Sequence, residues 1–135
     1  MEIRVLPDAD AVAREAAGFI AGEARSAVAD RGRFIMAVSG GRTPWQMLRL
    51  LADEKVPWKG VHVAQVDERV APAGDPDRNL MQLRESLLEH APLLTEQLYP
   101  MPVEEHDLRA AARRYAMTLQ ESAAFATVYG HRSPR

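Results

Sequence analysis

Two short apolar runs, each followed directly by a polar loop, constrain the fold of this chain more than any other feature. Residues 34–38 read Phe-Ile-Met-Ala-Val and lead into Ser39-Gly40-Gly41-Arg42-Thr43-Pro44. Residues 61–65 read Val-His-Val-Ala-Gln and lead into Val66-Asp67-Glu68-Arg69. Such runs are typical of strands covered on both faces, as in parallel sheets. Because the carboxyl ends of parallel strands open into one crevice, we expect the two loops to face the same ligand.

Helical patterns separate the expected strands. Asp8 can cap a helix that runs to about residue 30, and Gly32 fits its C-terminal stop. Thr43 and Pro44 are typical of a helix start, as the cap and the first helical residue. The apolar residues expected to face inward are, in the first helix, Val12, Ala16, Phe19, Ile20, Ala24 and Val28, and in the second, Met47, Leu48 and Leu51.

The remaining expected elements continue the alternation. Further helices are predicted at about residues 79–89 and 107–122. The strand after the second helix is expected to cover residues 61–66, and further strands are predicted at residues 2–6, 97–101 and 125–129. The order predicts an α/β fold of the Rossmann-like, three-layer type, with a mainly parallel sheet and helices on both faces. With 135 residues, 47% of them hydrophobic, the chain is long enough for one globular domain.

Composition excludes several function classes. A net charge of -2 argues against a nucleic-acid binder, which normally needs a clustered basic face. The absence of cysteine excludes disulfides and thiolate chemistry, and none of the four histidines has metal-ligand spacing with another. No signal pattern opens the chain and no apolar run approaches the roughly 20 residues of a membrane span. We therefore expect a cytoplasmic protein with neither a membrane nor a nucleic-acid partner.

The first polar loop admits two interpretations. Gly40 and Gly41 allow the backbone to approach a ligand, the helix that follows presents free N–H groups, and Arg42 adds a charged donor. Phosphate binding is one interpretation. The other is a tight strand-to-helix turn with a solvated arginine, and spacing alone does not separate the two.

The second polar loop also admits two interpretations. Asp67, Glu68 and Arg69 stand at a strand end, where an arginine can bind a phosphate or carboxylate in a forked geometry. Taken alone, the loop favours an internal ion pair that steadies it. Asn79, after Arg78, is by spacing alone better suited to cap a helix than to bind a ligand. A serine triad is unsupported, because no Gly-x-Ser-x-Gly pattern occurs.

Taken together, the motifs resemble a known family. Val38-Ser39-Gly40-Gly41-Arg42-Thr43-Pro44, Pro57-Trp58, Val66-Asp67-Glu68-Arg69-Val70 and Asp77-Arg78-Asn79-Leu80 resemble, in order and spacing, the first two signature regions of the 6-phosphogluconolactonases. The resemblance covers residues 1–122. The related glucosamine-6-phosphate deaminases usually carry a Gly-x-Gly-Ser-Thr-Pro loop and a tyrosine after Asp-Glu, so the sequence favours the lactonase.

The resemblance implies an activity and a set of site residues. The activity is hydrolysis of 6-phosphoglucono-δ-lactone to 6-phosphogluconate in the pentose phosphate pathway, without a metal or an organic cofactor. The residues expected to bind the substrate are Gly40, Gly41, Arg42, Thr43, Arg69 and Asn79. Asp67 is expected to orient polar groups. Arg78 replaces the serine that the family usually carries before this asparagine.

The resemblance breaks off after about Ala123. The family's motif Gly-x-Asp-Gly-His-Thr-Ala-Ser-Leu, whose histidine is the expected general base, has no counterpart, and only Gly130-His131 matches it near the chain end. We therefore expect a lactonase-like domain over 1–122 with a divergent tail over 123–135, incomplete on its C-terminal side through premature termination or a frameshift. His131 is the weak candidate for the base.

Three functional interpretations follow from this break. The chain is a lactonase, a phosphosugar-binding module without turnover, or an inactive fragment; a deaminase-like sugar phosphate enzyme is a further alternative. Uncovered apolar surface would promote weak self-association of an otherwise monomeric chain.

Overall fold

The computed structural model of the chain describes the backbone of residues 1–129 and the side chains as far as residue 122. Its elements are α1 (Ala9–Arg31), β1 (Phe34–Val38), α2 (Arg42–Leu51), η1 (Trp58–Gly60), β2 (Val61–Gln65), α3 (Asn79–Leu83), η2 (Arg84–Leu88), η3 (Thr95–Gln97), β3 (Leu98–Tyr99) and α4 (Leu108–Tyr129). This order confirms the predicted α/β alternation.

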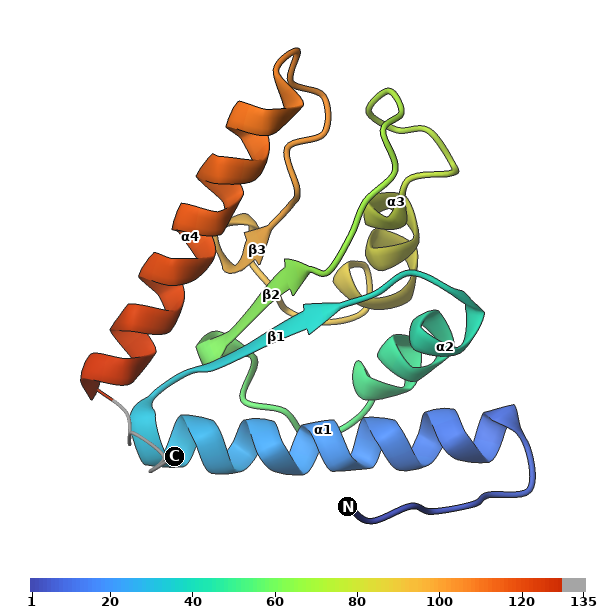
Figure 1. The fold of residues 1–135 in the computed structure, drawn as a ribbon. Helices are drawn as coiled ribbons and strands as arrows, with labels where there is room; N and C mark the ends of the chain where they lie inside the picture. Colours follow the sequence, from blue (N-terminus) through green and yellow to red (C-terminus); the bar gives the residue numbers. More distant parts are fainter. Residues whose placement is uncertain (130–135) are drawn as a thin grey trace.

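The three strands form one parallel sheet in the order β1-β2-β3 (Figure 1). In β1 and β2, Phe34 pairs with Val61 and Val38 with Gln65, so both strands end at the same level. Val63 of β2 pairs with Leu98 of β3. The parallel arrangement that the apolar runs predicted is confirmed, and it places the segments that follow β1 and β2 at one edge of the sheet.

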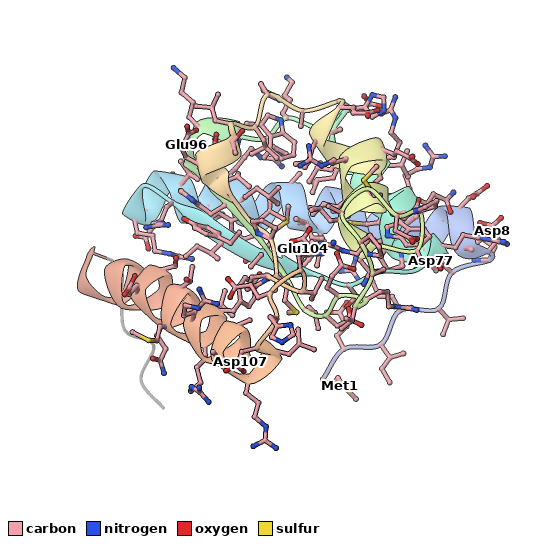
Figure 2. The ribbon with its side chains drawn as sticks, turned by 90° about the horizontal axis from the view of Figure 1, so that it is seen from above. Met1, Asp8, Asp77, Glu96, Glu104 and Asp107 are labelled. Carbon is pink, nitrogen blue, oxygen red and sulfur yellow. The ribbon has the colours of Figure 1, made fainter. Side chains whose placement is uncertain are left out.

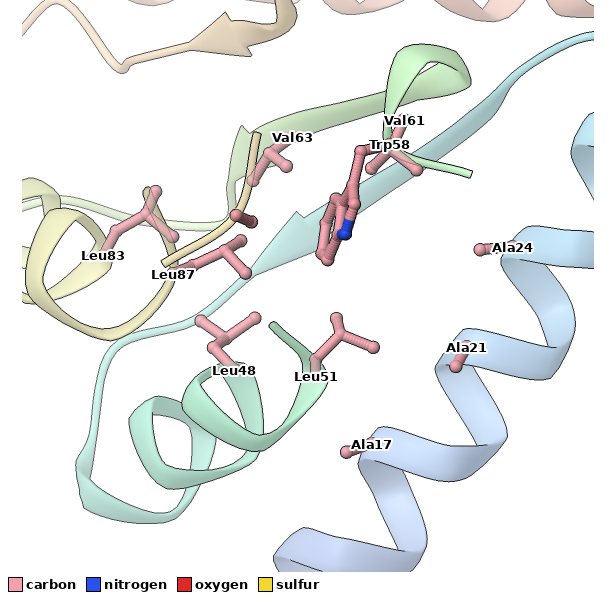
Figure 3. Packing of buried hydrophobic residues seen from close by; sticks show 11 residues of the cluster. Ala17, Ala21, Ala24, Leu48, Leu51, Trp58, Val61, Val63, Leu83 and Leu87 are labelled. Carbon is pink, nitrogen blue, oxygen red and sulfur yellow. The ribbon is translucent and has the colours of Figure 1, made fainter. Parts of the chain in front are cut away.

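One face of the sheet carries the main hydrophobic core (Figure 3). The strands contribute Val61 and Val63, and the helices α1, α2 and η2 cover them. Leu48 and Leu87 have no exposed surface, and burial of a leucine side chain is worth about 1.5–3 kcal/mol. The other buried residues of this core are Ala17, Ala21, Ala24, Leu51, Trp58, Leu83 and Ala91.

Helix α4 lies across the sheet from α2 (Figure 1), and Tyr115 anchors it. The Tyr115 hydroxyl accepts a hydrogen bond from the Gln65 backbone N–H at 2.8 Å and donates one to the Tyr99 carbonyl at 2.5 Å. Burial raises the pKa of Tyr115, although the Gln65 N–H opposes that shift. A cavity of about 340 Å³, lined in part by Ile35 and Leu119, remains between the sheet and α4.

The first helix begins and ends as predicted, and its predicted inward face is correct in part: Ala24 is buried in the core and Ile20 packs against it. Asp8 Oδ1 accepts from the Ala11 N–H at 2.8 Å, and Gly32 closes the helix at φ 81°. The buried stripe consists of alanines, namely Ala13, Ala17, Ala21, Ala24 and Ala27. Val12 and Phe19, expected to point inward, are 42% and 67% exposed. Alanines let α1 approach α2 closely, which bulky side chains would prevent.

Two predicted strands are wrong. Residues 2–6 join no sheet within the described chain; they lie exposed along α1, where Arg4 pairs with Glu15. Residues 125–129, predicted as a strand after a helix ending at residue 122, continue α4 to Tyr129. No glycine or proline separates residue 122 from residue 129, and the alanines there favour the helix. The β-branched and aromatic residues of this segment misled the strand prediction.

Smaller boundary errors have local causes. The predicted strand 97–101 reduces to Leu98–Tyr99, because Pro100 and Pro102 lack the N–H that a ladder needs. The predicted strand 61–66 ends at Gln65. The helix predicted over 79–89 divides into α3 and the π-helical segment η2, although Leu83 and Leu87 are buried as its periodicity required.

Candidate functional site

The polar loops after β1 and β2 meet at the carboxyl edge of the sheet. The Val66 N–H donates to the Val38 carbonyl at 2.9 Å, so the two chains are still bonded where the loops begin. Beyond that bond, one loop turns into α2 and the other runs to α3. The loops therefore leave the sheet side by side, and that they face the same ligand stays a prediction.

Gly40 and Asn79 make the closest approach between the first loop and α3. A Cβ built on Gly40 would lie 2.2 Å from Asn79 Oδ1, so only glycine fits there. Asn79 Nδ2 in turn donates to the backbone oxygen and to Oδ1 of Asp67, each at 3.3 Å. Three predicted site residues, Gly40, Asp67 and Asn79, are therefore brought together. Asn79 is buried and bridges the loops, so its contact with a ligand stays a prediction.

The start of α2 faces the same edge. Gly41 precedes the helix at φ 119°, in a region that other residues rarely adopt, and the helix begins at Arg42. Thr43, predicted as the cap, lies instead in the first turn, and among the described residues no side chain caps this end. The helix start thus leaves backbone N–H groups and the positive end of a dipole directed outward. Arg42 and Thr43 are exposed beside them.

Glu68 is a buried carboxylate that organises the second loop. Its Oε1 accepts from the N–H groups of Arg69 at 2.7 Å and Asn79 at 2.6 Å. Its Oε2 accepts from the Leu80 N–H at 2.9 Å and from Gln65 Nε2 at 3.1 Å. Burial alone would raise the pKa of Glu68, but these four hydrogen bonds lower it to about 2. The carboxylate is therefore ionised and fastens the start of α3 to the end of β2.

Arg78 completes this buried network. Its side chain is 1% exposed, and Nε lies 3.1 Å from Glu68 Oε2. Nη1 lies 2.9 Å from Glu104 Oε1 and donates to the Ala71 carbonyl at 3.2 Å. An internal ion pair that steadies the loop is thus present, but it joins Glu68 to Arg78 rather than to Arg69. The burial of Arg78 was missed from the sequence, where only its departure from the family's serine marked the position.

The charged side chains of the two loops that remain open to a ligand are those of Asp67, Arg69 and Arg42. All are exposed, and the two guanidinium groups have no ion-pair partner within the described part of the chain. Arg42 lies at the start of α2 and Arg69 on the loop after β2, and exposed guanidinium groups on neighbouring loops are suited to an anion such as a phosphate. Asp67, held by Asn79, adds an acceptor for a hydroxyl or a water.

The three histidines of the described residues differ in their distance from this edge. His106 lines a cavity with Val70 and Ala71 of the second loop. His62 Nδ1 is 2.9 Å from the Tyr99 hydroxyl, and burial together with the Arg33 charge lowers the pKa of His62. His90 and His106 are exposed, and neither is bonded to a residue of the candidate site. His131, the candidate base, lies outside the described residues. Within the described part of the chain, no group of histidine and carboxylate side chains is arranged to hold a metal ion, and none of the helices could span a membrane.

The fold defines an open α/β protein, a class in which the carboxyl ends of the strands are the usual place for a ligand, and the candidate site lies at this edge. Comparison with family models gives the particular family. Residues 7–133 match the model described as glucosamine-6-phosphate isomerases/6-phosphogluconolactonase, and the chain belongs to this family.

Relatives in sequence are named as lactonases. A 6-phosphogluconolactonase of Mycobacterium tuberculosis is 35% identical over 128 residues, covering 90% of this chain and 52% of its own length. That of Nostoc sp. is 30% identical and covers 87% and 49%. The chain thus spans about half the length of the relatives that it matches.

Solved structures agree with the fold. A monomeric glucosamine-6-phosphate deaminase superposes with a TM-score of 0.81 at 16% identity, covering 91% of this chain and 52% of the other. A 6-phosphogluconolactonase from Shewanella baltica gives 0.74 at 27% identity, covering 84% and 48%. These likenesses confirm a Rossmann-like fold, of which this chain supplies about half.

Proposed function

We propose that this chain binds a phosphorylated sugar lactone and serves in the hydrolysis of 6-phosphoglucono-δ-lactone to 6-phosphogluconate. The observation that carries the proposal is the convergence of Gly40, Asp67 and Asn79 at one sheet edge, on loops that also carry the exposed arginines Arg42 and Arg69. The names of the relatives support the lactone as substrate. A lactonase-like unit over residues 1–122 and a cytoplasmic location belong to the same proposal.

The roles proposed for the residues follow from charge and exposure. The amide groups of Gly40, Gly41 and the first turn of α2, with Thr43 and Arg42, receive the phosphate or another anionic group of the ligand. Arg69 supplies a forked donor from the opposite loop. Asp67 accepts a hydrogen bond from a sugar hydroxyl or from the attacking water. None of these groups requires a metal or an organic cofactor for binding.

A second candidate is phosphosugar binding without turnover. The observation that favours it is that no histidine of the described residues is hydrogen-bonded to a candidate site residue, whereas a positioned general base typically contributes 10²–10⁴-fold to rate. His131 is the only histidine that lies outside the described residues. The experiment below therefore tests whether His131 takes part in hydrolysis.

The experiment compares lactone hydrolysis by the purified chain with the spontaneous rate, alongside Arg69→Ala and His131→Ala. The lactonase proposal expects a rate above buffer, and a kcat/KM at least about tenfold lower in Arg69→Ala, since a charged hydrogen bond is worth about 1.5–3 kcal/mol. A rate equal to buffer with saturable 6-phosphogluconate binding supports the second candidate. If the chain shows neither hydrolysis of the lactone nor binding of 6-phosphogluconate, both candidate functions are contradicted.

A further inference from the structure

Arg78 stands out because the proposed chemistry does not use it. Among the side chains that the structure describes it is the largest that is fully buried, it lies next to the candidate site, and it occupies the residue before α3. A cation at a helix N-terminus meets the positive end of the helix dipole. A buried cation is also costly unless it is paired. A residue that is unfavourable on both counts needs a role that a serine or asparagine cap would not fill.

The pairing of Arg78 links segments that are far apart in the sequence. Nε lies 3.1 Å from Glu68, at the start of the loop, and Nη1 is bonded to the Ala71 carbonyl in the middle of it. The same Nη1 lies 2.9 Å from Glu104, in the connection between β3 and α4. In Figure 2, Glu104 lies over the middle of the molecule, between Asp107 at the start of α4 and Asp77 at the end of the loop.

Glu68 does not need Arg78 for its own solvation. Four N–H donors already surround its two oxygens. What the guanidinium adds is the connection to Glu104, whose side chain is 49% exposed and reaches the network from outside. The bond thus ties the loop that carries Asp67 and Arg69 to the β3–α4 connection.

We propose that Arg78 is a positioning residue of the candidate site: by joining Glu68 to Glu104 it holds the 66–78 loop against the β3–α4 connection and thereby sets the affinity for the phosphosugar. The inference rests on the proposed function for its ligand. Arg78 itself does not touch the ligand. Asp67 and Arg69 take their positions from a loop that Arg78 closes at its start, middle and end.

The chain offers a matched pair of variants for the test. Glu104→Gln removes the outer end of the link and leaves Arg78 paired with Glu68. Glu105→Gln, at the neighbouring residue, makes the same change of charge but breaks only an exposed pair with Arg114 on α4. Removing a carboxylate strengthens the field that attracts an anionic ligand, so electrostatics alone predicts tighter 6-phosphogluconate binding in both variants.

The readouts are the dissociation constant for 6-phosphogluconate and the hydrogen-exchange rates of the Asn79 and Leu80 amides, which donate hydrogen bonds to Glu68. We expect Glu104→Gln to weaken binding about three- to tenfold and to speed exchange of both amides, whereas Glu105→Gln should bind at least as tightly as the parent and exchange like it. Arg78→Lys, which keeps the charge but loses the fork, should weaken binding further. Equal affinities and equal exchange in the two glutamine variants would overturn the proposal.

A merely structural role has a different signature. It would lower the thermal midpoint of Glu104→Gln and leave the affinity of the folded protein unchanged, which also overturns the proposal. If the parent chain does not bind 6-phosphogluconate, the proposed function fails, but amide exchange still decides the coupling. Faster exchange in Glu104→Gln than in Glu105→Gln would then support the link between Glu104 and the loop, and unchanged exchange would refute it.

Discussion

Gly40 and Asn79 fit together so closely that the side-chain amide of Asn79 occupies the space a Cβ on residue 40 would need, with Oδ1 only 2.2 Å from that position. Gly40→Ala must therefore displace Asn79 and with it the bond to Asp67. We expect a loss of about 1–3 kcal/mol in unfolding free energy, as for overpacking elsewhere, and a marked loss of 6-phosphogluconate binding. Denaturant titration and calorimetric binding measure the two effects.

Gly18 provides the control for this substitution. It lies inside α1, and nothing stands within 4 Å of a Cβ built on it. Gly18→Ala should raise stability by about 0.5–1 kcal/mol and leave binding unchanged, because alanine lowers the cost of ordering a helix. Equal behaviour of the two variants would show that Asn79 does not depend on the glycine.

The Glu68 carboxylate should make the free energy of unfolding depend on pH in the acid range. Its folded pKa is about 2, below the ordinary 4.5, so the folded state binds this proton less readily than the unfolded state. The contribution, on the order of 2–3 kcal/mol, is complete above pH about 4.5 and is lost as the pH falls towards 2. Other carboxylates also titrate in this range, so the informative quantity is the difference between the parent and Glu68→Gln.

That difference should be largest near neutral pH and should shrink through the window from pH 4.5 to pH 2. Urea unfolding at several pH values measures it. A difference that stays constant across the window would mean that the hydrogen bonds to Glu68 do not favour its ionised form.

The alanine face of α1 permits a test of the helix register. Ala21 is fully buried, so Ala21→Leu adds bulk to a packed core and should cost about 1–3 kcal/mol. Phe19, two residues earlier, is 67% exposed, and Phe19→Ala should change stability by less than about 0.5 kcal/mol. The reverse order of effects, measured by thermal unfolding, would restore the face that the apolar periodicity predicted.

The parts of the fold that the sequence predicted well are those that local chemistry determines. Asp8 and Gly32 bound α1 because capping and a left-handed turn depend on these residues alone. The apolar runs at β1 and β2 indicated parallel strands because both faces of such strands are covered. The inward face of α1 was predicted correctly at Ala24 and Ile20 but wrongly at Phe19, because hydrophobicity favours Phe19 whereas close packing on α2 favours alanine.

Within the candidate site, the limits of sequence reasoning lie in tertiary partners. The loops after the strands were predicted to meet, since the geometry of a parallel sheet requires it. The pairing of Arg78 with Glu68 and Glu104 was not, because Glu104 is 26 residues away and no local pattern links the two. The strand prediction for residues 125–129 was wrong for a related reason: β-branched and aromatic residues favour strands only where a neighbouring strand pairs with them.

The most direct test of the central claim is a titration of the labelled chain with 6-phosphogluconate, followed by backbone amide chemical shifts, with gluconate as the control that lacks the phosphate. The claim that the two loops form one phosphosugar site predicts that the amides of residues 39–43, 67–69 and 79 shift together along one saturation curve. Gluconate should shift them far less, and Arg42→Ala or Arg69→Ala should reduce the affinity. Shifts confined to one loop, shifts gathered elsewhere on the sheet, or an equal response to gluconate would contradict it.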